Sequence, residues 1–335
     1  MLTTAPALAD PTLPAPLSAP GQANPAQVSA DYETALAAFE AGNFPRALRL
    51  AKASADAGSS DAAVMAGYIL RSGDAGSPDL SAARRYYELG AARGHPDALV
   101  ALGEMGLAGE AGLTDRDAYA YLTRASDAGR TDATRALAEM ARTGRGTDAS
   151  IETQRDMLQR ASDSFDTDAT KTLADTYFET DPQKALQLYE DAAQAGHVEA
   201  AYIAGVMYAE NLSIRPDEER SAYWLGRAAK AGHAAAQADY GLLVYQGAGV
   251  PRSETEAADL FRRSAEGGDS EGMFLYAFTL AKGEGLEQDF GEAYYWLLKA
   301  GQSGVDSYQS DRDVLRQRLE DNVDPAVLAE ARARL

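Results

Sequence analysis

Glycines that close amphipathic stretches return along the chain at a nearly constant interval. Most neighbours in this series are 35 or 36 residues apart, and one gap of 67 residues holds a degenerate unit with Phe165 in the equivalent place. The glycines, called marker glycines below, are Gly58, Gly94, Gly129, Gly196, Gly232, Gly268 and Gly304. An interval of this length is the signature of a repeat array.

Small and large residues keep fixed offsets before each marker. Three and four residues upstream lie two small residues, such as Ala228 and Ala229 before Gly232, and eleven upstream the residue is most often alanine. Eight upstream lies a large apolar or aromatic residue, as at Trp224 and Trp296. Because these spacings fall on one face of a helix, the pattern predicts a helix before each marker with this face in the core.

A second series of small residues runs in step with the markers and predicts another helix in each unit. Its members, called anchors below, are Gly67, Gly103, Ala138, Ala174, Gly205, Gly241 and Ala277. Glycine inside a helix costs roughly 1 kcal/mol relative to alanine, so its return indicates close packing. Loops with two glycines, such as Gly247–Gly249, separate the two helices. Two helices per 36 residues predict an all-α fold, an α/α solenoid.

The segment Ala222–His233, with the sequence AYWLGRAAKAGH, resembles the Sel-one-like repeat, a relative of the tetratricopeptide repeat. The resemblance covers residues 31–305 and implies a right-handed superhelix of about eight helix pairs. Two units depart from the pattern: residues 31–58 lack the glycine-rich loop, and residues 167–196 are five residues shorter. We expect the second departure to change the superhelical twist locally.

Both ends of the chain differ from the repeats. Residues 1–30 are rich in proline and alanine, which predicts a disordered linker. Within it, Ala7–Ala9 has the form of a signal-peptidase site, although no basic and apolar stretch precedes it, so residues 1–9 are either the end of a signal peptide or a chance match. The first alternative predicts a periplasmic or otherwise exported protein and the second a cytoplasmic one. Residues 306–335 are charge-rich, and Asp324 and Pro325 open a last helix of a C-terminal cap.

The charge and composition exclude several classes of protein. The formal net charge is −20, which disfavours binding to nucleic acid and to anionic membrane surfaces. No stretch is apolar enough for membrane insertion. The chain has no cysteine, which excludes disulfides, thiolate metal sites and cysteine nucleophiles.

No motif predicts a catalytic, cofactor or metal site. The three histidines, His95, His197 and His233, each follow a marker glycine, which is typical of a repeated turn residue. The resemblance implies a non-catalytic scaffold or adaptor that binds a protein or peptide partner. It also implies an alternative, because some Sel-one-like proteins bind or hydrolyse β-lactams. Those proteins are rich in cysteine, and this chain has neither cysteine nor a Ser-x-x-Lys motif.

The resemblance also implies where a partner binds. In tetratricopeptide geometry the first helix of each pair lines the concave groove, through residues three before and one and four after the anchor. These offsets define a mixed-charge zone in the middle units and an apolar, aromatic zone toward the C-terminus. The charged zone comprises Arg135, Glu139, Arg142, Lys171 and Asp175. The aromatic zone comprises Tyr202, Val206, Leu242, Tyr245, Phe274 and Phe278, which either anchor a peptide or pack against the next helix pair.

Overall fold

The computed structural model describes residues 25–209, 215–302 and 308–335, and all regular structure in these ranges is helical. The first helix begins at Pro25, inside the segment predicted as a linker. The rest of that segment, with Ala7–Ala9, lies outside the described residues.

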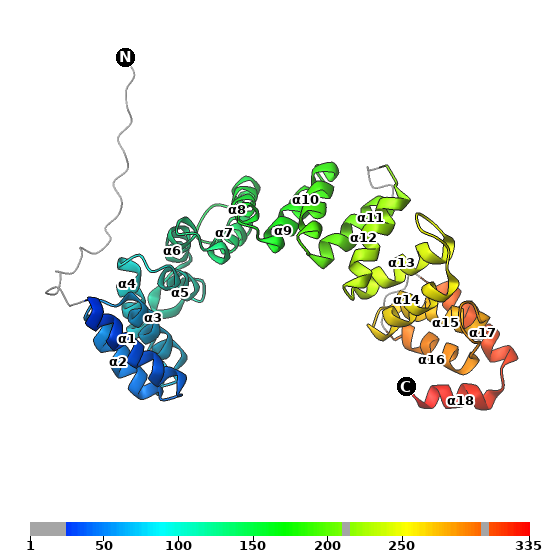
Figure 1. Cartoon of the computed structure of the whole chain (residues 1–335), viewed down its shortest axis with the longest axis horizontal. Helices are drawn as coiled ribbons and strands as arrows, with labels where there is room; N and C mark the ends of the chain where they lie inside the picture. The colour runs from blue at the N-terminus through cyan, green and yellow to red at the C-terminus, as the bar shows by residue number, and fades with distance from the viewer. Residues whose placement is uncertain (1–24, 210–214, 303–307) are drawn as a thin grey trace, which may run out of the picture. The chain divides into compact units, whose positions relative to one another are not determined.

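The chain divides into two compact units, the first ending at Arg160 and the second beginning at Ala161. Helices follow one another in pairs through both units, as predicted (Figure 1). The helices that begin in the first unit are α1 (Pro25–Glu40), α2 (Phe44–Asp56), α3 (Ser60–Ser72), α4 (Leu80–Ala92), α5 (Pro96–Leu107), the short 3₁₀ helix η1 (Glu110–Gly112), α6 (Asp115–Asp127), α7 (Thr131–Thr143) and α8 (Ile151–Asp163). Those of the second unit are α9 (Thr167–Tyr177), α10 (Pro182–Gln194), α11 (Val198–Ala209), α12 (Glu218–Lys230), α13 (Ala234–Gln246), α14 (Glu254–Glu266), α15 (Ser270–Lys282), α16 (Phe290–Ala300), α17 (Gln309–Asn322) and α18 (Pro325–Ala333).

Short polar side chains begin most of these helices. Each accepts a hydrogen bond from a backbone N–H of the first turn, which otherwise has no partner. These N-cap residues are Asn43, Ser59, Asp79, Thr114, Asp166, Asp181, Asp217, Ser253, Asp269, Asp289 and Asp324. The predicted helix start at Asp324 and Pro325 is therefore confirmed.

The predicted core face is confirmed, with one shift of register. The small residues before each marker are buried except Ser162 and Gly301, and the residues eleven before it are all buried. The residues eight before it, predicted to fill the core, are buried in some units and half-buried in others. Seven before the marker, by contrast, every unit places a buried residue. These residues are Ala51, Tyr87, Leu122, Leu158, Tyr189, Leu225, Phe261 and Leu297.

The shift of register explains the glycine anchors. A Cβ built on Gly103 would lie 2.5 Å from Cγ of Leu122, and one on Gly241 would lie 2.6 Å from Cε1 of Phe261. Gly67 and Gly205 face their own partners seven before the marker in the same way. Because a glycine anchor has no side chain, the second helix of the pair can approach the first helix closely at this position.

The loops with two glycines connect the two helices of one pair and also contact the preceding pair. Gly247 ends α13 in the left-handed conformation, with φ of +76°. Gly249 has φ of +67°, and a Cβ there would lie 2.2 Å from the carbonyl oxygen of Glu218, the first residue of α12. Gly146 and Gly285 approach the preceding pair equally closely. The second glycine is thus required both by its φ and by contact with the preceding pair.

Phe165 replaces the marker glycine in the degenerate unit. Its φ is +65°, a value that residues other than glycine rarely adopt. The residue is also 93% exposed. The ring therefore contributes no core contact that would offset the unfavourable backbone conformation.

Two further helices follow the eighth pair. Leu328 and Ala331 of α18 are buried, and α18 packs against α16. The hydroxyl of Tyr294 on α16 donates to Glu320 on α17 at 2.5 Å, and Arg332 on α18 donates to Glu320 at 3.0 Å. The two helices are therefore fixed to the last pair by apolar and polar contacts.

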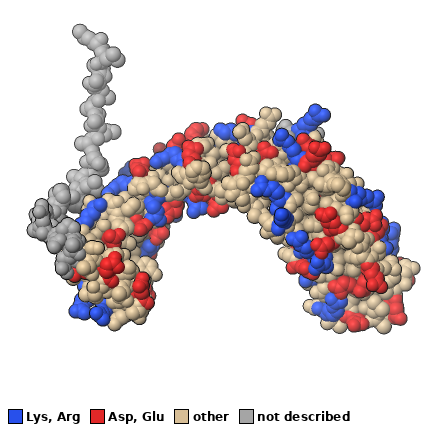
Figure 2. All heavy atoms as spheres, in the orientation of Figure 1, with Lys and Arg blue, Asp and Glu red and all other residues tan. Residues whose placement is uncertain are grey.

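Acidic and basic side chains are interspersed over the face drawn in Figure 2, and no continuous basic patch covers the described residues visible there. None of the helices within the described ranges combines the length and apolar character of a membrane span.

Candidate partner-binding surfaces

The histidines after the marker glycines are helix caps that also connect neighbouring pairs. Nδ1 of His95 accepts a hydrogen bond from the backbone N–H of Asp97 at 3.2 Å. Its Nε2 therefore carries the proton, and it lies 3.1 Å from the carboxylate of Asp61 on the preceding pair. His197 and His233 make the same two kinds of contact. In the described part of the chain, no three His, Asp or Glu side chains are grouped to hold a metal ion.

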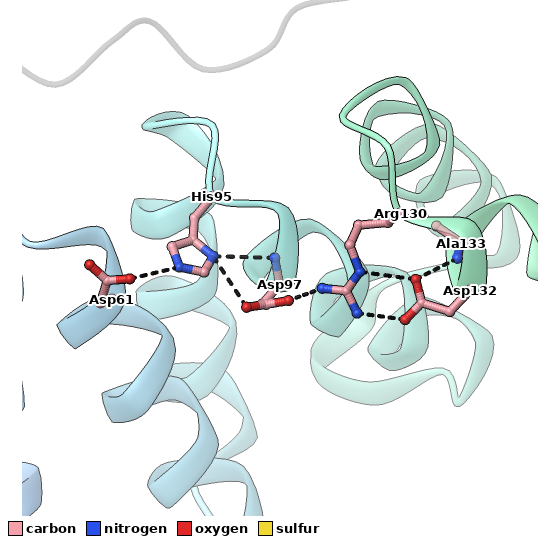
Figure 3. A network of polar contacts seen from close by, with 6 residues as sticks. All are labelled: Asp61, His95, Asp97, Arg130, Asp132 and Ala133. Atoms are coloured by element: carbon pink, nitrogen blue, oxygen red, sulfur yellow. Dashed lines mark hydrogen bonds and ion pairs between the residues drawn. The ribbon is translucent and has the colours of Figure 1, made fainter. Parts of the chain in front are cut away.

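Arg130 takes the place of histidine in the next unit and extends the connection (Figure 3). Its guanidinium forms an ion pair with Asp97 of the preceding pair and two hydrogen bonds with Asp132, at 2.6 and 3.1 Å. Asp132 also accepts from the backbone N–H of Ala133 at 2.9 Å. The result is a continuous polar chain along the beginnings of α3, α5 and α7, which fixes the spacing of these first helices.

Most residues of the predicted charged zone form ion pairs with another residue of the same helix. Glu139 and Arg142 on α7 are joined by two hydrogen bonds of 2.6 and 2.7 Å, and both are exposed, as is Arg135. Lys171 on α9, in the second unit, lies 3.0 Å from Asp175. Ion pairs of this kind on an exposed helix face contribute little to stability, so these charges can exchange partners at low cost.

Tyr202 and Val206 lie on α11 in the aromatic zone, where both are half-buried. The Tyr202 ring stacks on His233, with ring centroids 4.5 Å apart. Burial, followed by the nearby carboxylate of Asp239, raises the pKa of Tyr202 to about 12. The ring is therefore held in one place by its own and the next pair.

Leu242 and Tyr245 lie on α13, also half-buried. The Tyr245 hydroxyl donates to Glu284 in the loop of the following pair at 2.6 Å, and Arg252 lies over its ring. Tyr245 therefore links two pairs, while part of its ring stays exposed.

Phe274 and Phe278 on α15 lie against the C-terminal cap. Phe274 is only 6% exposed and stacks on Tyr308, with centroids 5.0 Å apart. Tyr308 also donates to Glu271 at 2.8 Å, which fixes it in place. Phe278 is half-buried and borders a groove of about 330 Å³ between α15 and α17. Tyr308 therefore covers one face of the Phe274 ring, and Phe274 also lines this groove.

The structure brings two parts of the aromatic zone to one place. Tyr202 and Tyr308 line the same cavity of about 120 Å³, together with Asp239 and Glu271, and the Tyr308 ring also stacks on Phe274. Tyr245 does not line this cavity. The aromatic zone is therefore divided, and the chain's own C-terminal segment covers its Phe274 end.

The sequence interpretation missed an exposed groove in the first unit. It has a volume of about 500 Å³ and lies along α3 and α5, with Val64, Tyr68, Val100 and Ala101 among its lining residues. Three of these residues follow from the offsets already described, because Val64 and Tyr68 flank the anchor Gly67, and Val100 precedes Gly103. The prediction had applied those offsets to later units alone.

The comparison with known families decides the nature of the repeats. The profile of the Sel1 repeat matches residues 60–95, 96–129, 177–197, 198–233, 234–269 and 270–305, which together make up more than half of the chain. The chain belongs to the Sel1 repeat family. Each match that covers a full unit begins at a first helix and ends at the marker glycine or one residue after it, as for residues 198–233. A search of curated proteins gave no match.

The chain is also similar to solved structures of repeat proteins. A crystal structure of a Sel1 repeat protein from Oxalobacter formigenes is 24% identical, covers 88% of this chain and 90% of its own, and superposes with a TM-score of 0.66. The protective antigen c5321 of uropathogenic Escherichia coli, which displays the same repeat fold, is 18% identical over 92% of this chain and 83% of its own, with a TM-score of 0.40. The first of these confirms the Sel1 solenoid as the fold of this chain.

Proposed function

We propose that this Sel1 repeat protein is a non-catalytic scaffold that binds a protein or peptide partner along the exposed faces of its first helices. The observation that carries the proposal is the groove on α3 and α5, where an exposed tyrosine lies among half-buried aliphatic residues. Aromatic side chains provide large contact areas at a low entropy cost, which is typical of binding surfaces. In the second unit Tyr202 and Tyr245 belong to the same proposed surface. The charged contacts are Arg135 on α7 of the first unit and Lys171 on α9 of the second.

Site-specific photo-crosslinking tests this proposal. A photoreactive phenylalanine analogue replaces Tyr68, Tyr202 or Tyr245 in cells of the native organism, and crosslinked products are identified by mass spectrometry. The matched control is Tyr223, which is 57% exposed on α12, a second helix. We expect the groove positions to capture one shared partner and the control to capture none. Equal capture from all positions contradicts the proposal.

We also propose that the protein acts without catalysis. Its Sel1 repeats contain no cysteine and no Ser-x-x-Lys motif, which separates them from the β-lactam alternative. The purified chain should therefore leave nitrocefin unchanged. Turnover that is retained through successive purification steps would overturn this part of the proposal.

We propose, finally, that the protein is exported and that its mature form begins at Asp10. The support is the small-x-small pattern of Ala7–Ala9, which lies outside the described residues. N-terminal sequencing of the protein from native cells should give Asp10. An intact Met1 would favour a cytoplasmic adaptor instead.

A further inference from the structure

The groove of the first unit has an apolar floor that is held in place and open to solvent. Tyr68 is 51% exposed, and the edge of its ring packs against Phe39 of α1, with centroids 5.9 Å apart. Val64 and Val100 are half-buried on either side of the same groove. A rigid, exposed aromatic ring among aliphatic residues is the arrangement in which a partner's apolar side chain can lose its hydration.

The charges at the two ends of the groove are arranged unequally. At one end Arg71 lies between Glu104 and Glu110, with both contacts at 2.9 Å. The Arg71 side chain is 25% exposed, whereas that of Glu104 is 57% exposed. The guanidinium is therefore covered and already neutralised, and the carboxylate of Glu104 faces solvent.

The other end of the groove repeats this arrangement with different residues. Arg130 is 32% exposed and paired with two carboxylates, while one of these, Asp97, is 57% exposed (Figure 3). Asp61, on the same polar chain, is 58% exposed. At both ends a partner thus meets carboxylates before it meets arginines.

We propose that this groove binds a basic amphipathic segment of a partner protein. An apolar side chain of the segment packs on Tyr68, and lysine or arginine residues on either side pair with Glu104 and Asp97. This inference rests on the proposed scaffold function and specifies the chemistry of its partner. Complementary charge at the rim sets specificity and association rate, whereas the apolar centre provides most of the affinity.

An acidic partner is disfavoured by the same observations. Its carboxylates would approach Glu104 and Asp97 directly, and the net charge of −20 would repel it at longer range. To bind, it would have to separate Arg71 or Arg130 from carboxylates that already hold them. Separation is costly above all for Arg71 and Glu110, whose side chains are each only 25% exposed, because solvent would compensate the remaining charge only in part.

Three synthetic peptides of equal length test the inference on the full chain. One alternates leucine and lysine in an amphipathic pattern, the second replaces lysine by glutamate, and the third replaces leucine by serine while keeping every lysine. Binding is measured by fluorescence anisotropy at physiological ionic strength, where long-range attraction is screened over about 8 Å. Hydrogen exchange on the wild-type complex then locates the binding site without any substitution.

The variants distinguish the contribution of the apolar floor at Tyr68 from that of the exposed carboxylate of Glu104. Tyr68→Ala should weaken binding of the leucine–lysine peptide at least tenfold. Glu104→Gln should weaken it several-fold, because Glu110 still holds Arg71 while the exposed charge is lost. Tyr223→Ala, an exposed tyrosine of the second unit, should leave binding unchanged. In hydrogen exchange, protection should appear in α3 and α5.

Three results would overturn the inference, and they differ from a failure of the scaffold function. Equal binding of the serine–lysine peptide, or binding that is unaffected by Tyr68→Ala, means that the net charge alone attracts basic peptides. Tyr68-dependent binding of the leucine–glutamate peptide instead keeps the groove as a binding site and refutes the basic partner. The scaffold function itself fails when crosslinking from Tyr68, Tyr202 and Tyr245 gives no shared partner.

Discussion

Gly205, in the middle of α11, provides a direct test of the close approach between paired helices. Alanine is favoured over glycine inside a helix by about 1 kcal/mol, so Gly205→Ala would ordinarily stabilise the protein. Here the new Cβ would lie 2.6 Å from Cγ of Leu225 and 2.9 Å from its backbone nitrogen. Because backbone as well as side chain must shift, the cost should fall in the upper part of the 1–3 kcal/mol that is typical of overpacking. We therefore expect a net loss of about 1–2 kcal/mol in the free energy of unfolding.

The assay is urea unfolding followed by circular dichroism at 222 nm, with a matched variant at the same register. Ala277 is the anchor of α15 and is fully buried, so Ala277→Gly should also destabilise, by about 1 kcal/mol from helix propensity alone. Gly205→Ala and Ala277→Gly are opposite substitutions at equivalent positions, and both should lower the free energy of unfolding. Leu225→Ala should make room for the new methyl group, and the double variant should lose less stability than the two single variants together.

The reasoning fails if Gly205→Ala raises the free energy of unfolding. It also fails if the effects of Gly205→Ala and Leu225→Ala add without coupling. In either case the recurrent glycine would not be explained by contact with the residue seven before the marker.

Three further predictions concern single side chains. Trp224→Ala should cost about 3–5 kcal/mol and deprive Glu190 of the indole N–H that it accepts at 3.0 Å, with hydrogen exchange rising first in α11 and α12. Phe165→Gly should raise the melting temperature, because the left-handed conformation that costs phenylalanine roughly 1–2 kcal/mol is allowed for glycine, and no buried contact is removed. Burial raises the pKa of Tyr87 from 10.0 to about 12, so the contribution of Tyr87 to stability is complete below pH 10 and is lost as the pH rises toward 12. The free energy of unfolding of Tyr87→Phe, measured between pH 10 and pH 12, should not show this decrease.

Much of the fold could be predicted because its determinants are local. Helix caps such as Asp324 and the spacing of small residues act within one or two turns, so the sequence displays them directly. The register of the core was harder to predict. Tyr86 and Tyr87 are neighbours, as are Leu260 and Phe261, and both residues of each pair are large. The choice between them depends on where the glycine of the other helix lies, which is a tertiary contact.

The binding surface was less predictable, because the offsets identify a helix face and not what covers it. Phe274 was correctly placed on α15, yet Tyr308, more than thirty residues later, stacks on its ring. Nothing near Phe274 in the sequence indicates this contact. Tyr68 was missed for a simpler reason, since applying the same offsets to Gly67 would have identified it. Its exposure, however, could be known only from the structure.

The loop that reaches back to the preceding pair also determines how the array can change in length. Gly249 lies against the first residue of α12, and Gly285 lies against that of α14 in the same way, so the unit of residues 234–269 has both a loop that contacts the preceding pair and a helix start that the following loop contacts. A tandem duplication of one such unit would bring complete joints at both of its ends. A deletion of one whole unit would likewise leave matching surfaces to meet. The number of units is therefore free to vary by whole-unit gain or loss, whereas the length of a unit is constrained by the contact between neighbours.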